Sequence, residues 1–195
     1  MKTPFFTVGH SNRSFQAFAA LLIGAEINLV ADIRTVPRSR ANPQFNKGTL
    51  PDALAPFHIS YDHVAALGGL RGKARALSRD INGFWTNESF HNYADYALSE
   101  HFRAGLEHLL EQGRKRRCAI MCSEALWWRC HRRIVADYLI ASGETAFHIM
   151  GQGRLEPARL TSGAVIQSGG TVIYPSANRT DARSAMNSPI ATHDK

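Results

Sequence analysis

The fold is decided by the stretch Arg117-Cys118-Ala119-Ile120-Met121-Cys122, in which every residue after Arg117 is apolar. A short continuous apolar run of this kind is typical of a strand that is buried on both faces. A helical pattern follows from about residue 130 to 142 and ends at Gly143, and the apolar segment 146–150 then predicts another buried strand. Strand, helix and strand in this order indicate parallel pairing with a right-handed crossover.

The same alternation extends toward the start of the chain. We predict strands at residues 5–8, 29–33 and 57–61, helices at 14–24, 50–56, 89–98 and 100–112, and a loop rich in Gly and Arg at 67–88. Apolar segments at 164–166 and 171–174, separated by Gly169-Gly170, predict a hairpin. We therefore expect an α/β fold: a three-layer sandwich with a mostly parallel sheet and a small C-terminal β-hairpin at the sheet's edge.

The length of 195 residues fits one domain, which we expect to span residues 4–175. The polar segment 176–195 is predicted to be a disordered C-terminal tail. The three cysteines do not suggest a disulfide framework and suit a reducing compartment. No apolar run approaches the ~20 residues of a membrane-spanning helix, and the chain turns polar too early for a signal peptide. We expect a cytoplasmic protein without a membrane partner.

The charge balance favours acidic partners. Lys and Arg total 23 against 16 Asp and Glu, which gives a formal charge of +7. An anionic small molecule or a nucleic acid is therefore the expected partner, although a soluble basic protein with no such partner has the same composition. Within the loop at 67–88, the cations Arg71, Lys73, Arg75 and Arg79 are the best candidates for a nucleic-acid contact.

Ligands of open parallel sheets bind outside the carboxyl ends of the strands, so the residues that follow the predicted strands are the candidate site. We expect an anion to be bound by Gly9, Ser11, Arg34, Arg38, Arg129 and Arg132. We expect catalytic roles for His10, Asp32, Cys122, Glu124, Cys130 and His131. The prediction is that these residues, from distant parts of the chain, meet in one crevice.

The residue types suggest how the catalytic group would divide its work. Cys130 lies near a predicted helix N-terminus among arginines, which favours its thiolate, and either it or Cys122 is a candidate nucleophile. His10, Asp32, Glu124 and His131 are the candidate proton carriers. Structural roles compete: Asp32 and Arg34 can form an ion pair, Glu124 can pair with Arg132, and a cysteine is often only a small buried side chain.

Metal binding is the minority alternative. Zinc would use Cys122, Cys130 and His131, with a distant His10. The seven residues between the two cysteines do not match a zinc finger or ribbon, and no cofactor motif is present. The thiol-phosphatase loop is excluded by spacing, because six residues rather than five separate Cys122 from Arg129.

Several blocks of sequence together resemble a known family. They are Thr7-Val8-Gly9-His10-Ser11-Asn12-Arg13-Ser14, Asp32-Ile33-Arg34 with Pro37-Arg38-Ser39-Arg40, Asn42-Pro43-Gln44-Phe45-Asn46, Leu67-Gly68-Gly69, Phe90 through Tyr96, and Met121-Cys122-Ser123-Glu124 with Trp128-Arg129-Cys130-His131-Arg132. Over residues 5–175 the chain resembles the family called domain of unknown function 488. The resemblance implies a cytosolic α/β domain and supplies no reaction. One family element, at 157–161, often carries a His that is absent here.

Three functions are compatible with this sequence. The leading hypothesis is an enzyme that acts on a phosphate-bearing substrate, a nucleotide or nucleic acid. The first alternative is a non-catalytic nucleic-acid-binding module, in which the cationic loop grips phosphates and Trp127 or Trp128 stacks on a base. The second is a sensor of a small metabolite.

Overall fold

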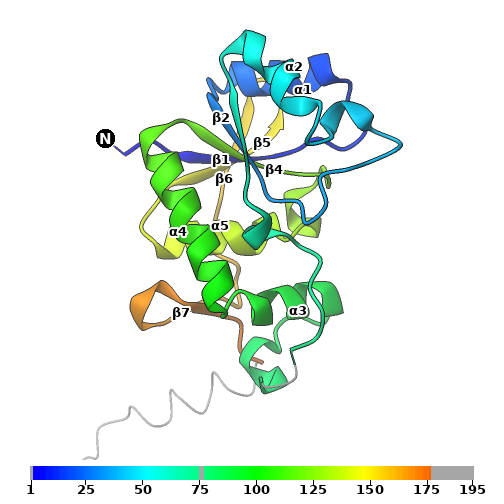
Figure 1. The fold of residues 1–195 in the computed structure, drawn as a ribbon. Coiled ribbons are helices and arrows are strands. Elements are labelled where there is room, and N and C mark those ends of the chain that lie inside the picture. Colours follow the sequence, from blue (N-terminus) through cyan, green and yellow to red (C-terminus); the bar gives the residue numbers. More distant parts are fainter. Residues whose placement is uncertain (1, 75–76, 177–195) are drawn as a thin grey trace, which may run out of the picture.

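The computed structural model of the protein describes residues 2–74 and 77–176, which form an α/β fold around a six-stranded sheet (Figure 1). The strand order is β3-β2-β4-β1-β5-β6, and every pairing is parallel except that of β5 with β6. The strands are β1 (Phe5–Gly9), β2 (Leu29–Asp32), β3 (Ser60–His63), β4 (Cys118–Cys122), β5 (Ala146–Gly151) and β6 (Arg154–Pro157). The predicted three-layer fold with a mostly parallel sheet is confirmed.

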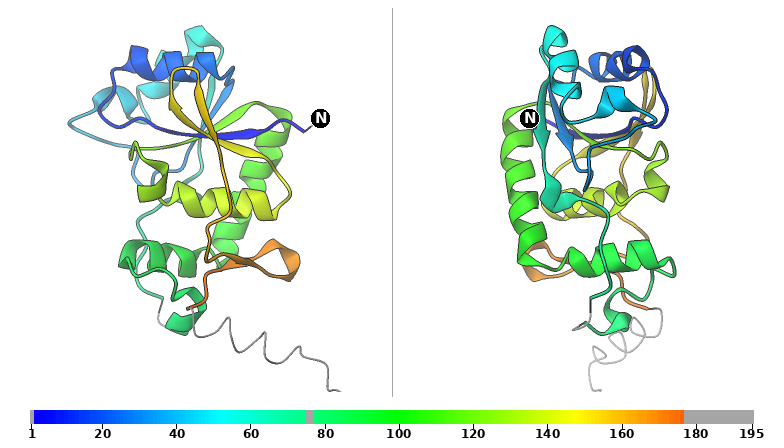
Figure 2. Two further views of the ribbon diagram at one scale, coloured as in Figure 1. Left: turned by 180° about the vertical axis from the view of Figure 1, so that it is seen from behind. Right: turned by 45° about the vertical axis from the view of Figure 1, so that its right-hand side comes forward.

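Helices cover both faces of this sheet (Figures 1 and 2). They are α1 (Phe15–Gly24) and α2 (Leu50–Leu54) on one face and α4 (Glu100–Lys115) and α5 (Arg132–Ala141) on the other, whereas α3 (Glu88–Tyr96) lies beyond α5, away from the sheet. Alternate residues of β4 face opposite layers: Ala119 and Met121 belong to the core beneath α1 and α2, and Ile120 belongs to the core beneath α4 and α5. Burial on both faces explains why the strand is a continuous apolar run.

Local signals explain where the helices begin. The Ser14 hydroxyl accepts a hydrogen bond from the Ala17 N–H at 3.1 Å, and the Ser99 hydroxyl caps α4 in the same way through Phe102. These caps satisfy N–H groups that a helix leaves without partners at its first turn. The predicted helices at 14–24, 89–98 and 100–112 are therefore confirmed, with small shifts at their ends.

The third strand differs from its prediction. It begins at Ser60 rather than at residue 57, because a 3₁₀ turn spans Ala55–Phe57 and His58 adopts a left-handed backbone conformation with φ of 57°. An extended strand cannot pass through that conformation. The pairing with β2 therefore starts after the turn.

The C-terminal hairpin is present, in a different place from the one predicted. Its strands β7 (Val165–Ile166) and β8 (Val172–Ile173) form a two-stranded sheet of their own. The hairpin lies beyond α5, away from the main sheet, and the edge of that sheet is occupied by β6 (Figure 2). No sequence pattern predicted β6, because its side chains are largely exposed and its apolar residues do not form a run.

Two further expectations from the sequence can be compared with the structure only for the residues that it describes. No helix within residues 2–74 and 77–176 is long and apolar enough to span a membrane. The tail predicted at 176–195 lies, apart from Ser176, outside the described residues, and so does Arg75 of the cationic loop.

Candidate functional site

The carboxyl ends of β1, β2 and β4 lie together and deliver most of the predicted site residues. In the parallel register, Gly9 is the partner of Cys122 and Asp32 is the partner of Met121. Backbone hydrogen bonds continue past the strands: the His10 N–H donates to the Cys122 carbonyl at 3.0 Å, and the Ser11 N–H donates to the Ser123 carbonyl at 2.8 Å. The segments after β1 and β4 are therefore tied side by side.

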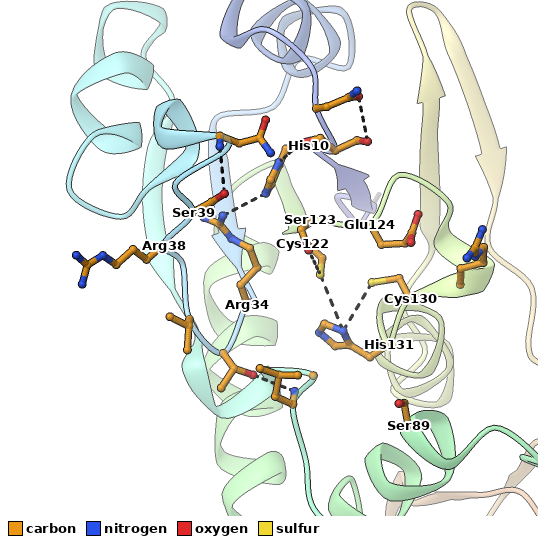
Figure 3. Close-up of a pocket in the computed structure, with 18 of the residues that line it drawn as sticks. His10, Arg34, Arg38, Ser39, Ser89, Cys122, Ser123, Glu124, Cys130 and His131 are labelled. Atoms are coloured by element: carbon orange, nitrogen blue, oxygen red, sulfur yellow. Dashed lines mark hydrogen bonds between the residues drawn. The ribbon is translucent and has the colours of Figure 1, made fainter.

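A cavity of about 710 Å³ opens at this edge of the sheet (Figure 3). Nine of the residues predicted from the sequence line it: His10, Ser11, Arg34, Arg38, Cys122, Glu124, Arg129, Cys130 and His131. Of the predicted residues, Gly9, Asp32 and Arg132 are not among those that line it. Arg38 is exposed, and its guanidinium points away from Cys122 and His131. The predicted convergence in one crevice therefore holds for most of the set.

Two thiols and an imidazole meet at one side of the cavity. His131 Nδ1 lies 3.7 Å from the Cys130 sulfur and 4.0 Å from the Cys122 sulfur. Cys122 ends β4, whereas Cys130 and His131 immediately precede α5. The strand end and the start of the next helix therefore bring together a cluster of three side chains, here called the Cys-His cluster: Cys122, Cys130 and His131 (Figure 3).

The hydrogen bond on the far side of His131 fixes its tautomer. His131 Nε2 lies 3.2 Å from the carbonyl oxygen of Ile33. A carbonyl only accepts hydrogen bonds, so Nε2 carries the proton and donates, and in the neutral ring Nδ1 presents a lone pair to the two sulfurs. The Ile33 carbonyl, which follows β2, therefore holds the ring, and Nδ1 is directed toward the sulfurs of Cys122 and Cys130.

The two thiols of the cluster differ in acidity. The pKa of Cys122 lies well below its ordinary value, mainly because of the neighbouring Cys130 thiol, with further contributions from His131 and the charge of Arg132. Burial and the neighbouring Cys122 sulfur raise the pKa of Cys130. Cys122 is therefore the more acidic of the two thiols, whereas the place of Cys130 near a helix N-terminus led us to expect that its thiolate would be favoured.

Arg34 is held in place by a buried network behind the cavity wall. Its Nε and Nη2 donate to the two oxygens of Asp32 at 2.9 and 2.6 Å, and Nη2 also donates to the Phe45 carbonyl. The Tyr61 hydroxyl donates to the same carboxylate at 2.7 Å. Asp32 is 0% exposed, and its oxygens are occupied by these donors. Of the two roles considered for Asp32, this geometry fits the structural ion pair.

His10 completes the network from β1. Its Nδ1 donates to the Ser11 carbonyl at 2.7 Å, which leaves Nε2 to accept a hydrogen bond from Arg34 Nη1 at 3.1 Å. The ring stacks on Phe45 with centroids 4.2 Å apart, and burial lowers the pKa of His10. Both nitrogens of the neutral ring are therefore engaged, so His10 is placed to orient Arg34 rather than to exchange protons.

Gly9 and Arg132 build the site without facing its cavity. A Cβ at Gly9 would overlap the carbonyl of Glu124, so only glycine allows β1 to approach the loop after β4 so closely. Arg132 is 1% exposed, and its guanidinium donates to the carbonyls of Val8 and Ala125. The anion-binding roles predicted for these two residues stay predictions, because their contacts here are with backbone groups of the protein.

Glu124 lies on the cavity wall, where its carboxylate accepts a hydrogen bond from the Leu126 N–H at 3.1 Å. The structural alternative for this residue was an ion pair with Arg132, and the guanidinium of Arg132 instead contacts backbone carbonyls. Glu124 thus combines a local structural contact with a position from which it can reach a ligand.

The cavity also uses residues that the sequence did not single out as site residues. They include Asn12, Thr35, Ser39, Asn42, Gly69, Ser89, Phe90 and Ser123. Gly69 contacts the imidazole of His131 so closely that a Cβ there would overlap the ring. The signal that could have found them is their membership of the family-like blocks, because Asn12, Ser39, Asn42, Gly69, Phe90 and Ser123 all lie within those blocks.

A comparison with protein families gives a match. The model of the family described as Domain of unknown function DUF488 matches residues 14–139, well over half of the chain. The chain belongs to the DUF488 family. A comparison with curated proteins gives no match, and a comparison with solved structures gives none either.

The match covers most of the site of this DUF488 protein. Arg34 and the whole Cys-His cluster lie within the matched residues, whereas His10 and Ser11 precede them. The resemblance inferred from the sequence blocks is therefore confirmed as family membership.

Proposed function

We propose that this DUF488 protein is an enzyme that acts on a small phosphate-bearing substrate, with a nucleotide as the leading candidate. One observation carries the proposal: the Cys-His cluster and the side chains of Arg34 and Arg129 line the same cavity. A thiolate next to an imidazole is a reactive group, and guanidinium groups are the usual ligands of phosphate. A substrate held by the arginines would present its reacting atom to the cluster.

The size of the cavity supports a small substrate. A volume of about 710 Å³ lies within the range of roughly 300–1,000 Å³ typical of small-molecule pockets. A nucleotide or a sugar phosphate fits such a space, whereas a nucleic-acid duplex contacts a broad surface instead. The polar lining from Ser11, Asn12, Ser39 and Asn42 provides hydrogen-bonding groups for the remainder of a polar ligand.

Two arginines line the cavity, and Arg34, whose charge is balanced by Asp32, offers its one remaining N–H group as a donor. Arg34 is 7% exposed, and four of its five N–H groups donate to Asp32, His10 and Phe45, so its orientation is fixed before any ligand arrives. Such preorganisation favours binding because little conformational entropy is lost. Arg129 is exposed at the cavity and supplies a second, adaptable cation.

The nucleic-acid alternative has less support from the contacts of its residues. Arg71 donates to the carbonyls of Ala65, Ala66 and Gly68 and lies 3.6 Å from the ring centre of Tyr96. Arg79 pairs with Glu88 at 2.6 Å. These cations serve the protein's own structure. The exposed Trp128 and Lys73 remain as possible contacts for a nucleic acid.

Ligand binding is tested by thermal shift with nucleoside monophosphates, inorganic pyrophosphate and an uncharged nucleoside as the control ligand. We expect phosphate-bearing ligands to raise the Tm of the wild-type protein and the nucleoside to have little effect. Arg129→Ala should remove that increase. Arg154→Ala, which deletes an exposed arginine on β6, should retain it. Equal ligand responses in the two variants would contradict the proposed arginine contact.

Turnover is tested separately, by incubating the protein with phosphate-bearing compounds and identifying products by mass spectrometry. The wild-type protein should form a product that Cys122→Ala does not form. Ligand stabilisation without any product would favour the sensor alternative. Binding to oligonucleotides that weakens steeply with salt, with no response to mononucleotides, would favour the nucleic-acid-binding module.

A further inference from the structure

We propose that the Cys-His cluster binds one Zn²⁺ ion, with two thiolates and one imidazole as ligands and a fourth position open to the cavity. The ligand atoms of Cys122, Cys130 and His131 all lie within 4.8 Å of one another. The catalytic role of the ion rests on the proposed function, but its binding rests on the geometry of these three side chains alone.

The distances suit a tetrahedral ion. Zinc lies about 2.3 Å from sulfur and about 2.0–2.1 Å from nitrogen, so the sulfur-to-nitrogen edges of a tetrahedral site are roughly 3.6 Å. The corresponding separations here are 3.7 Å for Cys130 and 4.0 Å for Cys122. The two sulfur-to-nitrogen edges therefore differ from those of a tetrahedral site by a few tenths of an ångström. The two sulfurs, which lie within 4.8 Å of each other, would have to be about 3.8 Å apart around the ion. Two sulfurs and one nitrogen are ligands that zinc prefers, whereas magnesium and calcium prefer oxygen.

The surroundings of His131 prepare it as a ligand. Its Nε2–H donates to the Ile33 carbonyl, and Nδ1 therefore has its lone pair free on the side of the sulfurs. Histidines that bind zinc commonly donate their other N–H to a backbone carbonyl or a carboxylate in this way. Gly69 adds a second constraint, because its backbone packs against the ring at a distance that excludes any side chain.

The position of the cluster indicates a site with an open coordination position. Structural zinc sites have four protein ligands, whereas catalytic sites have three and leave one position for water or substrate. Among the described residues, the group of potential metal ligands found here has three members, and all three line the cavity. An ion held there would meet a ligand bound by Arg34 and Arg129.

The experiment is a zinc titration of the untagged full-length protein, stripped with a chelator and kept reduced by a phosphine. Competition with a chromophoric chelator gives the affinity, and Co²⁺ in place of Zn²⁺ gives visible absorption bands typical of tetrahedral thiolate coordination. We expect one ion per chain. Cys122→Ala, Cys130→Ala and His131→Ala should each weaken binding by at least about 100-fold.

Cys118→Ala is the matched control, because Cys118 belongs to the same strand as Cys122 and is buried away from the cavity. It should bind zinc like the wild-type protein, and circular dichroism verifies that each variant is folded. Equal affinity in Cys118→Ala and Cys122→Ala, or Co²⁺ spectra without thiolate bands, would overturn the inference. Zinc binding without any response to phosphate-bearing ligands would leave the metal site standing and remove the proposed function.

Discussion

Strand β4 carries a cysteine at each end, and the two residues have opposite chemical character. Cys118 begins the strand and Cys122 ends it, and both side chains belong to the same hydrophobic core. Burial raises the pKa of Cys118 to about 12, whereas the pKa of Cys122 is lowered by Cys130, His131 and Arg132. Both thiols are buried, so burial alone does not decide reactivity.

The difference comes from the direction of the parallel sheet. All five parallel strands end on the same side, and the loops after β1, β2 and β4 supply polar groups there. At the other end of β4, Cys118 is enclosed mainly by the apolar core. A functional site in such a fold is therefore located by the strand end that a residue occupies, and less by its residue type.

The largest expected difference between the two ends is in the rate of alkylation. In the metal-free native protein at pH 7, Cys122 should react at least about 100-fold faster than Cys118, because the thiolate is the reactive species and burial suppresses it at Cys118. Peptide mapping after timed exposure to iodoacetamide measures both rates. Similar rates at the two residues would contradict the proposed difference in reactivity between Cys118 and Cys122.

Serine substitution should destabilise the protein more at Cys118 than at Cys122, whereas alkylation should be faster at Cys122. Cys118→Ser places a hydroxyl in the apolar core and should lower the free energy of unfolding by about 1–3 kcal/mol. Cys122→Ser should cost less than about 1 kcal/mol in the metal-free protein, because His131 and Ser123 offer hydrogen-bond partners nearby. Urea unfolding gives both values. A greater loss of unfolding free energy for Cys122→Ser than for Cys118→Ser would contradict the expectation that the hydroxyl finds hydrogen-bond partners more readily at the Cys122 end.

Two glycines in one loop, Gly69 and Gly72, should differ in their effect on zinc binding. A Cβ at Gly69 would overlap His131, whereas a Cβ at Gly72 would have nothing within 4 Å. Gly69→Ala should therefore displace the imidazole and weaken zinc binding by about tenfold, as other losses of support for a metal ligand do. Gly72→Ala should change the affinity by less than about twofold. The zinc titration measures both, and equal effects would show that Gly69 does not support His131.

His148 lies in a part of the sheet away from the Cys-His cluster, and its effect on stability depends on pH. It hydrogen-bonds Thr7 at 2.8 Å and stacks on Trp127, and burial lowers the pKa of His148 to about 4. The unfolded chain binds a proton near pH 6.5 and the folded protein does not, so stability is greatest above pH 6.5 and falls as the pH decreases toward about 4. The loss should be at most about 1.4 kcal/mol per pH unit.

His148→Phe, which retains an aromatic ring against Trp127, should flatten the dependence of unfolding free energy on pH between about 4 and 6.5. Denaturant unfolding at several pH values measures it. An unchanged slope in the variant would assign the dependence to another group, of which His10 is the first candidate because burial lowers its pKa as well.

Much of this fold was predictable because its signals are local. The apolar run at 118–122, the cap at Ser14 and the strand-helix alternation are readable in single segments. The exposed edge strand β6 lacks any such signal, and the position of the hairpin depends on packing against distant elements. The convergence of the site followed from the rule for parallel sheets.

The roles of individual site residues were less predictable, because side-chain direction is decided by tertiary contacts. Arg34 and Arg132 have the same chemistry, yet one lines the cavity and the other binds backbone carbonyls behind it. Asp32 is enclosed by Arg34 and Tyr61, which lie on different strands or loops. Sequence spacing also disfavoured the Cys-His cluster as a metal site, since its thiols meet through the fold of a loop rather than at a finger-like interval.

If the Cys-His cluster and the cavity arginines Arg34 and Arg129 form one site, a bound ligand should protect the thiols of the cluster from alkylation. Alkylation rates at each cysteine of the metal-free protein are measured with and without a saturating phosphate-bearing ligand identified by thermal shift. The ligand should slow modification of Cys122 and leave the rate at Cys118 unchanged. A ligand that binds through Arg129 and leaves the rate at Cys122 unaltered would contradict it.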